Sequence, residues 1–168
     1  MITAESILGN IYRDKGMKDK YKKMSSKCEA IRINRLESQR VRMRKTSDKG
    51  TDIALTLPNG SHMRHGDVVL LTDDKMVIVE LEPEKVAVVE ITHLHDEDAI
   101  EVPVRIGHTI GNLHRPIKLQ DDRIIFPIQT DSEIDMFKKM FGELMHHLEV
   151  RADKMVFEPQ EEMDVHEH

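Results

Sequence analysis

Residues 86–91 (VAVVEI) are a nearly continuous apolar run, and they decide how the second half of the chain is interpreted. Such a run is typical of a strand at the centre of a sheet. The acidic segment that follows, residues 93–98 (HLHDED), is suited to the N-terminus of a helix. We therefore expect a central strand that leads into a helix.

Proline and glycine positions set the limits of this helix. Pro103 lies within about its first turn, where a missing N–H costs least. Gly107 and Gly111 fall on one helical face, which suggests close packing against another backbone. Gly111 and Asn112 predict the helix end, and Pro116 prevents its continuation.

The remainder of this half predicts a hairpin, a helix and a strand. The hairpin comprises residues 117–119 and 124–126. Thr130 or Asp131 caps the second helix, with Glu133 placed for a capping box if Thr130 is the cap. Its apolar stripe continues to Leu148, and residues 154–157 form a last short strand. The order β-α-β-β-α-β is that of a ferredoxin-like domain.

The first half of the chain has the pattern of a small all-β domain. A short apolar run at residues 5–11 is interpreted as a strand, and the lysine-rich residues 13–27 as a solvated loop. Close-set turns separate further short strands. These strands are predicted at residues 30–36, 41–44, 52–57, 68–71 and 76–81. The first two alternate apolar with basic residues, which indicates half-buried antiparallel strands.

The predicted fold class is therefore α+β, in three parts. Residues 1–83 form the small all-β domain and residues 84–158 the ferredoxin-like domain. Residues 159–168 form a disordered, histidine-bearing tail.

Composition excludes several classes of function. The net charge is −6 and no long basic block is present, which argues against a general nucleic-acid binder. Cys28 is the only cysteine, so neither an intramolecular disulfide nor a zinc–thiolate site within one chain is possible. We find neither a secretory signal nor an apolar stretch long enough to cross a bilayer, so we expect a soluble, cytoplasmic protein.

Histidine is the residue type that points to chemistry. The chain has ten histidines against one cysteine. Imidazole without thiolate suits Ni, Cu(II) or Zn rather than Cu(I) or Fe–S clusters. Within residues 107–116 (GHTIGNLHRP), His114 follows the predicted helix end and precedes a proline, so it should point into solvent or an interface. By position alone it could be a metal ligand or an imidazolium interacting with the helix dipole.

Residues 111–116 (GNLHRP), placed after an apolar helix, are one of several motifs that occur in a set order. The others are residues 38–44, 49–50, 55–57, 65–68, 141–142 and 157–159. Together they resemble the UreE family of urease accessory proteins, the nickel metallochaperones of urease assembly. Leu113 stands where the family usually has Arg. Residues 131–133 (DSE) stand where some members have histidines.

The resemblance implies a nickel-binding metallochaperone, not an enzyme, that delivers Ni(II) to the urease active site. It implies a homodimer in which two copies of His114 approach across the two-fold axis. His166 and His168 in the tail would complete the ligand set, and His108 is a further candidate. Zn(II) or Cu(II) could also bind. The β domain would dock other maturation proteins, including the maturation GTPase. Urease apoprotein would receive the nickel. Neither nucleic acid nor membrane is an expected partner.

Two other functions remain as alternatives. A metal-responsive sensor would regulate a partner, and it ranks above the second alternative, a metal-dependent hydrolase. The hydrolase would need three fixed protein ligands and a general base, and the sequence has no His-Glu-x-x-His pair.

Overall fold

The computed structural model describes residues 1–161, and the chain divides into two compact units, Met1–Glu82 and Pro83–His168. The division falls between Glu82 and Pro83, one residue before the boundary between Pro83 and Glu84 that the sequence predicts. Helices and sheets occur in both units, so the predicted α+β class is confirmed. None of the described helices is long and apolar enough to cross a membrane.

The second unit is built around a four-stranded sheet with strand order β11-β8-β10-β9. Every neighbouring pair in it is antiparallel. Along the chain the elements run β-α-β-β-α-β. They are β8 (Glu84–Ile91), α2 (Glu101–Asn112), β9 (Lys118–Gln120), β10 (Arg123–Pro127), α3 (Glu133–Phe141) and β11 (Leu148–Met155).

The middle of strand β8, residues 86–89, is apolar because both faces of the strand are covered there. Ala87 and Val89 belong to the core beneath the helices. Val86 and Val88 point to the opposite face, where they pack with Phe157 from the segment after β11. All four β8 side chains are at most 1% exposed, which explains why this strand lacks the alternation of a half-buried strand.

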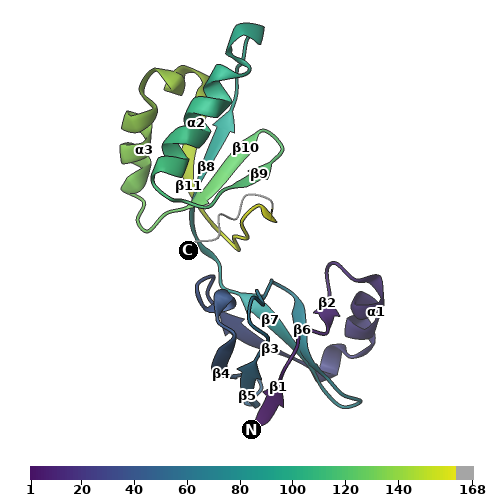
Figure 1. Ribbon diagram of the computed structural model, residues 1–168. Coiled ribbons are helices and arrows are strands. Elements are labelled where there is room, and N and C mark those ends of the chain that lie inside the picture. Colours follow the sequence, from purple (N-terminus) through teal and green to yellow (C-terminus); the bar gives the residue numbers. More distant parts are fainter. Residues whose placement is uncertain (162–168) are drawn as a thin grey trace. The chain divides into compact units, whose positions relative to one another are not determined.

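Helices α2 and α3 lie together on one face of this sheet (Figure 1). Each presents an apolar stripe at intervals of three or four residues to the sheet. The buried residues of the two stripes are Val102, Ile106, Ile110, Ile134, Phe137 and Phe141.

The second helix is shorter than the sequence predicts. Gly142, at φ +54°, follows the end of α3, and a 3₁₀ segment, Gly142–His147, continues the chain. Leu148 then opens β11, so its assignment to the helical stripe is wrong, and the predicted strand 154–157 begins six residues too late. Leu144 and Leu148 are four residues apart, a spacing that also occurs along a helix face. The pairing with β8 shows that Leu148 and Val150 face the core from a strand.

The first unit contains two sheets and one helix. The three-stranded sheet has order β1-β5-β4 and the four-stranded sheet has order β2-β6-β7-β3. Its elements are β1 (Ile2–Ala4), β2 (Gly9–Asn10), α1 (Lys15–Lys23), β3 (Cys28–Ile33), β4 (Arg42–Thr46), β5 (Asp52–Thr56), β6 (Asp67–Leu71) and β7 (Met76–Leu81).

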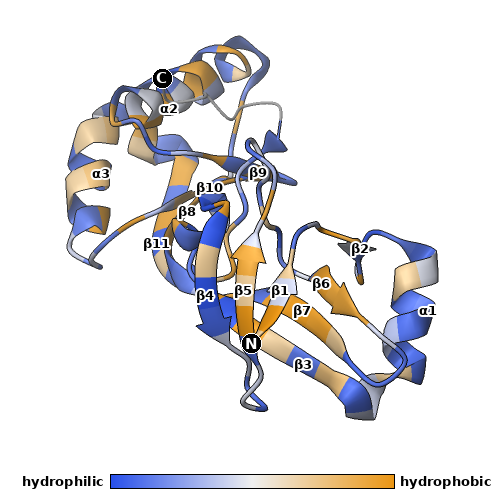
Figure 2. Cartoon of the chain, turned by 60° about the horizontal axis from the view of Figure 1, so that its bottom comes forward, coloured by the Kyte–Doolittle hydropathy of each residue, from blue (hydrophilic) through white to orange (hydrophobic). Residues whose placement is uncertain are grey.

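Helix α1 corrects the prediction of an all-β domain with a solvated loop at residues 13–27. Its surface is mostly hydrophilic (Figure 2), and none of its residues is fully buried. Met17, Tyr21 and Met24 nevertheless pack against one apolar cluster. Their spacing of four and three is helical. The many lysines around them obscure this short stripe in the sequence.

Strand β3 corrects a second expectation, that the first alternating strand is antiparallel. It pairs with β7 in parallel, from Cys28 opposite Met76 to Ile33 opposite Leu81. Strand β4 pairs with β5 in antiparallel fashion, as expected for the second alternating strand. Alternation reports a half-buried face, but it carries no information about the direction of the partner strand.

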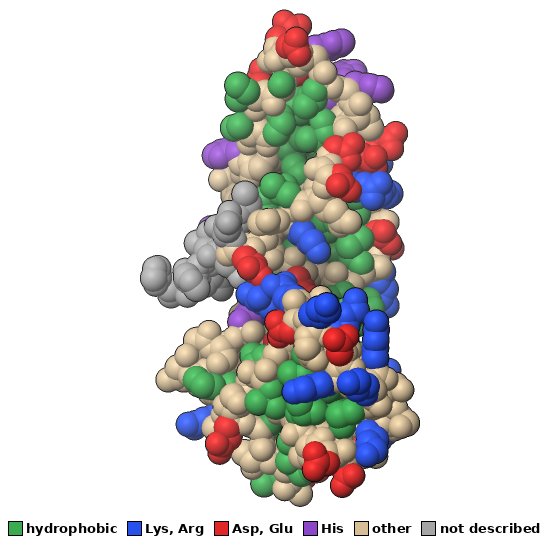
Figure 3. Space-filling view, turned by 90° about the vertical axis from the view of Figure 1, so that its right-hand side faces the viewer, with side chains coloured by type: hydrophobic (Ala, Val, Ile, Leu, Met, Phe, Trp, Pro, Cys, Tyr) green, Lys and Arg blue, Asp and Glu red, His purple; other side chains and the backbone are tan. Residues whose placement is uncertain are grey.

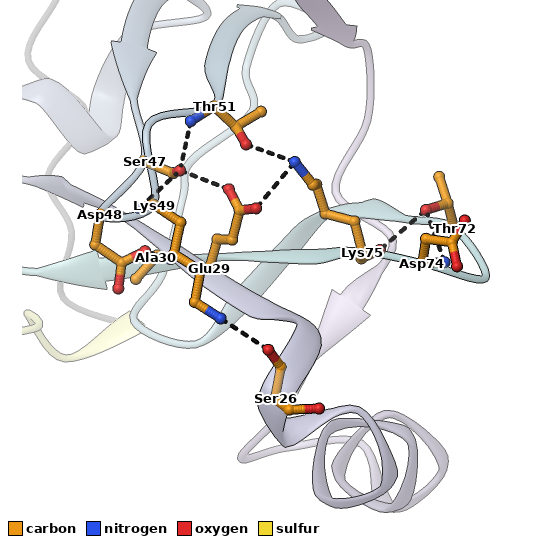
Figure 4. A network of polar contacts seen from close by, with 10 residues as sticks. All are labelled: Ser26, Glu29, Ala30, Ser47, Asp48, Lys49, Thr51, Thr72, Asp74 and Lys75. Carbon is orange, nitrogen blue, oxygen red and sulfur yellow. Dashed lines mark hydrogen bonds and ion pairs between the residues drawn. The ribbon is translucent and has the colours of Figure 1, made fainter.

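A buried carboxylate links β3 to the turn between β4 and β5 and to the start of β7 (Figure 4). Glu29 is 7% exposed; Ser47 donates a hydrogen bond of 2.5 Å to it and Lys75 Nζ lies 2.9 Å away. Lys75 also donates to Thr51 Oγ1 at 2.6 Å. Burial raises the pKa of Glu29, but hydrogen bonds from Ser47, Thr51 and Lys75, with the lysine charge, outweigh it and lower the pKa to about 2.

This pKa predicts how the stability of the first unit depends on pH. Because the folded-state pKa is below the unfolded one, the stabilisation is present above about pH 4.5 and is lost as pH falls toward 2. Glu29→Gln should cost about 1–3 kcal/mol at pH 7. Urea unfolding should show that the difference in free energy of unfolding between wild type and Glu29→Gln shrinks as the pH falls from 4.5 to 2. Glu5→Gln, which changes an exposed carboxyl, is the control; a deficit that is constant with pH would contradict the assignment.

A second special position in this unit is Gly66. It has φ +86° and donates its N–H to Val79 O at 2.8 Å. A Cβ added there would lie 2.4 Å from the Tyr12 ring and 3.1 Å from Ile11. Both the backbone conformation and the space therefore favour glycine.

Gly66→Ala should be more destabilising than the same change at a glycine that has a positive φ but free space around its added Cβ. Gly50, at φ +87° with nothing within 4 Å of its added Cβ, is the matched control. Gly50→Ala should cost about 1–2 kcal/mol, and Gly66→Ala about 1–3 kcal/mol more because of the overpacking. Equal shifts in the denaturation midpoint would show that the Tyr12 ring moves aside freely.

Candidate metal site

His114 lies in the turn that ends α2. Leu113 N–H bonds to Ile110 O at 3.1 Å and His114 N–H bonds to Gly111 O at 2.9 Å. His114 has φ +53°, in the left-handed region common at helix C-termini but rare for a residue other than Gly or Asn. Its side chain is exposed. His114 is therefore exposed beyond the helix end, which agrees with the prediction that it points into solvent or an interface.

An exposed apolar stripe runs along α2 toward this turn. Ile100 and Val104 are 78% and 63% exposed. Gly107 and Gly111 continue the stripe at helical spacing, and a Cβ added at either would meet nothing within 4 Å. The close approach of another backbone that the glycines predict is therefore absent from the described part of this chain, and the stripe remains open.

His108 lies on α2 and is also exposed. Its Nε2 lies 3.2 Å from Asn112 Nδ2, one turn further along the helix. This contact leaves the Nδ1 atom of His108 as its available ligand atom.

His166 and His168 lie outside the described residues, but the described segment just before them, at Gln160, is attached to the second unit. Gln160 N–H bonds to Ile117 O at 2.9 Å, and Leu119 N–H bonds to the Gln160 side chain at 3.3 Å. Gln160 was expected in a disordered tail, and it is instead attached beside β9. The six residues from Gln160 to His166 can span about 20 Å. Since Gln160 is attached at Ile117, only three residues after His114, a tail of this length is long enough for His166 to reach His114.

Several other histidines have structural contacts. His65 Nδ1 accepts a hydrogen bond from Leu81 N–H at 3.1 Å, and its ring stacks on Tyr12 with centroids 5.3 Å apart. His147 Nδ1 lies 2.7 Å from His93 O. Figure 3 shows a group of histidines at the end of the second unit where the segment after β8 lies.

The charge around the candidate site favours a cation. Residues 83–168 contain 9 Lys and Arg against 19 Asp and Glu, and eight of the ten histidines. A surface of this sign raises the local concentration of divalent cations. Within residues 1–161 of one chain, however, no three His, Cys, Asp or Glu side chains are grouped so that they could hold a metal ion.

Arg115 and Glu133 are residues whose importance the sequence did not reveal. Arg115 Nη1 donates to Pro127 O at 2.8 Å, and Nη2 donates to Glu133 Oε1 at 2.5 Å. The other oxygen of Glu133 accepts the N–H groups of Gln129 and Thr130. Burial raises the Glu133 pKa, but the bonds from Arg115 and the two N–H groups lower it overall. The one signal in the sequence was Glu133 as the capping-box acid. Thr130 N–H does bond to Glu133, but α3 begins at Glu133 with Ser132 as its N-cap and without a side-chain cap bond, so the predicted cap at Thr130 or Asp131 is wrong.

Comparison with known proteins gives the class of the first unit. Residues 4–82 match the family model described as the UreE urease accessory protein, N-terminal domain. This range ends where the first compact unit ends.

Individual relatives extend the match into the second unit. The chain is 26% identical to the urease accessory protein UreE of Natronomonas pharaonis, over 77% of this chain and 61% of that protein. It is 30% identical to UreE of Haemophilus influenzae, over 73% and 62%. With UreE of Yersinia bercovieri it shares 26% identity over 100% of this chain and 81% of that protein. The chain belongs to the UreE family of urease accessory proteins. The match spans about three fifths of the length of the first two relatives.

Proposed function

We propose that this protein binds Ni(II) through His114 and delivers it during maturation of the urease active site. The observation that carries the proposal is an exposed imidazole on a left-handed turn at the end of an uncovered helix stripe. Membership of a family whose relatives are named urease accessory proteins connects this site with urease. The acidic second unit favours a cation as cargo.

The proposed partner across the α2 stripe is a second copy of the chain. Ile100 and Val104 are large apolar side chains left in water, and the glycines beside them allow two helices to approach closely. A two-fold axis near the end of α2 would place one His114 from each chain in the same site. The β-α-β-β-α-β order and the sheet order support a ferredoxin-like domain at residues 84–158 for metal binding and dimerisation.

The remaining ligands are proposed to come from His166 and His168, with His108 as a further candidate. The attachment of Gln160 beside Ile117 supports this choice, because a short tether raises the effective concentration of the tail at His114 into the millimolar range. An open site made of imidazoles and water would release its metal more readily than a closed cage. Such a site would also accept Zn(II) and, more tightly, Cu(II).

The role proposed for the whole protein is that of a carrier and not an enzyme. Residues 1–83 would dock other maturation proteins, including the GTPase of nickel insertion, and urease apoprotein would receive the metal. We place this role in the cytoplasm, where urease would be assembled.

The first test removes the imidazole without disturbing the turn. Asparagine tolerates the left-handed conformation, so His114→Asn is preferable to His114→Ala. Titration calorimetry with Ni(II) should show one tight site per two chains in the wild type. The variant should lose more than the roughly 10–100-fold in affinity typical of groups that only support a ligand. His95→Asn, at another exposed histidine of the same unit, is the control, and unchanged binding by His114→Asn would refute the proposal.

The second test concerns the tail. A chain that ends at Glu161 keeps the Gln160 attachment and loses both tail histidines. It should bind Ni(II) about 10-fold or more weakly, because a tethered ligand is removed, while light scattering still gives a dimer. The double variant His166→Asn, His168→Asn separates the imidazoles from the length of the tail. If both proteins bind as the wild type does, the tail supplies no ligand.

A further inference from the structure

The direction of the His114 side chain depends on its backbone. Within residues 1–161 no side-chain hydrogen bond or ion pair of His114 is present, and the residue is exposed. The left-handed conformation of the turn fixes the direction of the Cα–Cβ bond, and with it the side of the turn from which the imidazole projects. Any group that holds this turn therefore controls the presentation of the candidate ligand.

On its N-terminal side the turn is held by the helix, through the bond from His114 N–H to Gly111 O at 2.9 Å. On its C-terminal side it is held by the next residue. Pro116 restricts Arg115 to extended conformations, and the Arg115 side chain reaches two other elements. Its two terminal nitrogens bond to the last residue of β10, Pro127, and to the first residue of α3, Glu133.

The Arg115 contacts are those of a partly buried anchor. The side chains of Arg115 and Glu133 are 23% and 16% exposed. The guanidinium carbon lies 5.9 Å from the ring centroid of Phe137, which is itself fully buried. Since Glu133 also accepts two backbone N–H groups, the acceptor is fixed before Arg115 binds it. A planar fork with several donors fits two acceptors in different directions, which an ammonium on a flexible stem does less well.

We propose that Arg115 is the positioning residue for His114: its guanidinium ties the turn after α2 to β10 and α3, and so holds the backbone from which the imidazole projects, without contacting the metal. This inference rests on the proposed function for its consequence in metal binding. The anchoring itself can be measured in the metal-free protein.

The test compares Arg115→Gln with Arg105→Gln. Arg105 lies on the same helix, but its ion pair with Glu101, at 3.3 Å, is exposed. Hydrogen exchange of the His114 N–H, measured by NMR on the full chain without metal, should be about 10-fold faster in Arg115→Gln and unchanged in Arg105→Gln. Nickel affinity should fall about 10–100-fold in the first variant only. Arg115→Lys, which keeps the charge but not the fork, should recover part of both losses.

The denaturation midpoint of each variant separates positioning from general stability. If Arg115→Gln lowers the midpoint so far that the unit unfolds, Glu133→Gln replaces it, because the neutral amide keeps the shape of the side chain and removes the ion pair with Arg115. Faster His114 exchange with a midpoint near that of wild type supports the proposal. Exchange and affinity equal to those of Arg105→Gln overturn it. Should His114→Asn retain tight nickel binding, the proposed function fails, while the metal-free exchange still decides whether Arg115 holds the turn.

Discussion

The four side chains from Val86 to Val89 alternate between two covered faces of one sheet, and the second unit is arranged around this constraint. Two of them pack beneath α2 and α3, and the other two pack with Phe157. Helix α2 connects β8 to β9 and α3 connects β10 to β11, and both helices pack on the same face of the sheet. The end of α2 therefore lies where the chain turns toward β9, and His114 occupies that turn.

The two units use polar groups in contrasting ways. In the first unit, Glu29 is buried with its partners and joins segments that are distant in sequence, so its contribution is to stability. His65 is likewise engaged, through Leu81 and Tyr12. In the second unit, His114 is left in solvent while its neighbour Arg115 makes the contacts. This arrangement fits the proposed role of His114, since a metal ligand must keep its polar atoms available while the adjacent side chain anchors the turn.

Several elements could be predicted because local patterns determine them. The continuous apolar run gave β8, and the proline and glycine positions gave α2 to within a few residues. Predictions failed where two periodicities coincide or where a stripe is short. Leu148 fits the spacing of a helical stripe but belongs to β11. The apolar stripe of α1 and the turn after it has only three residues, Met17, Tyr21 and Met24, and the many lysines around them obscured it. Direction of pairing, as between β3 and β7, is a property of two segments and is absent from either one alone.

By itself, the sequence determined the α+β class, the helix end at Asn112 and the histidine beyond it, since caps, prolines and apolar runs act over a few residues. It also carried the ordered motifs that assign the chain to its family. Only the tertiary structure decided that Arg115 reaches Pro127 and Glu133, that Gln160 attaches beside Ile117, and that the α2 stripe is uncovered. These contacts join residues 12 to 43 positions apart along the chain, and only the packing of the sheet and helices brings them within hydrogen-bonding distance.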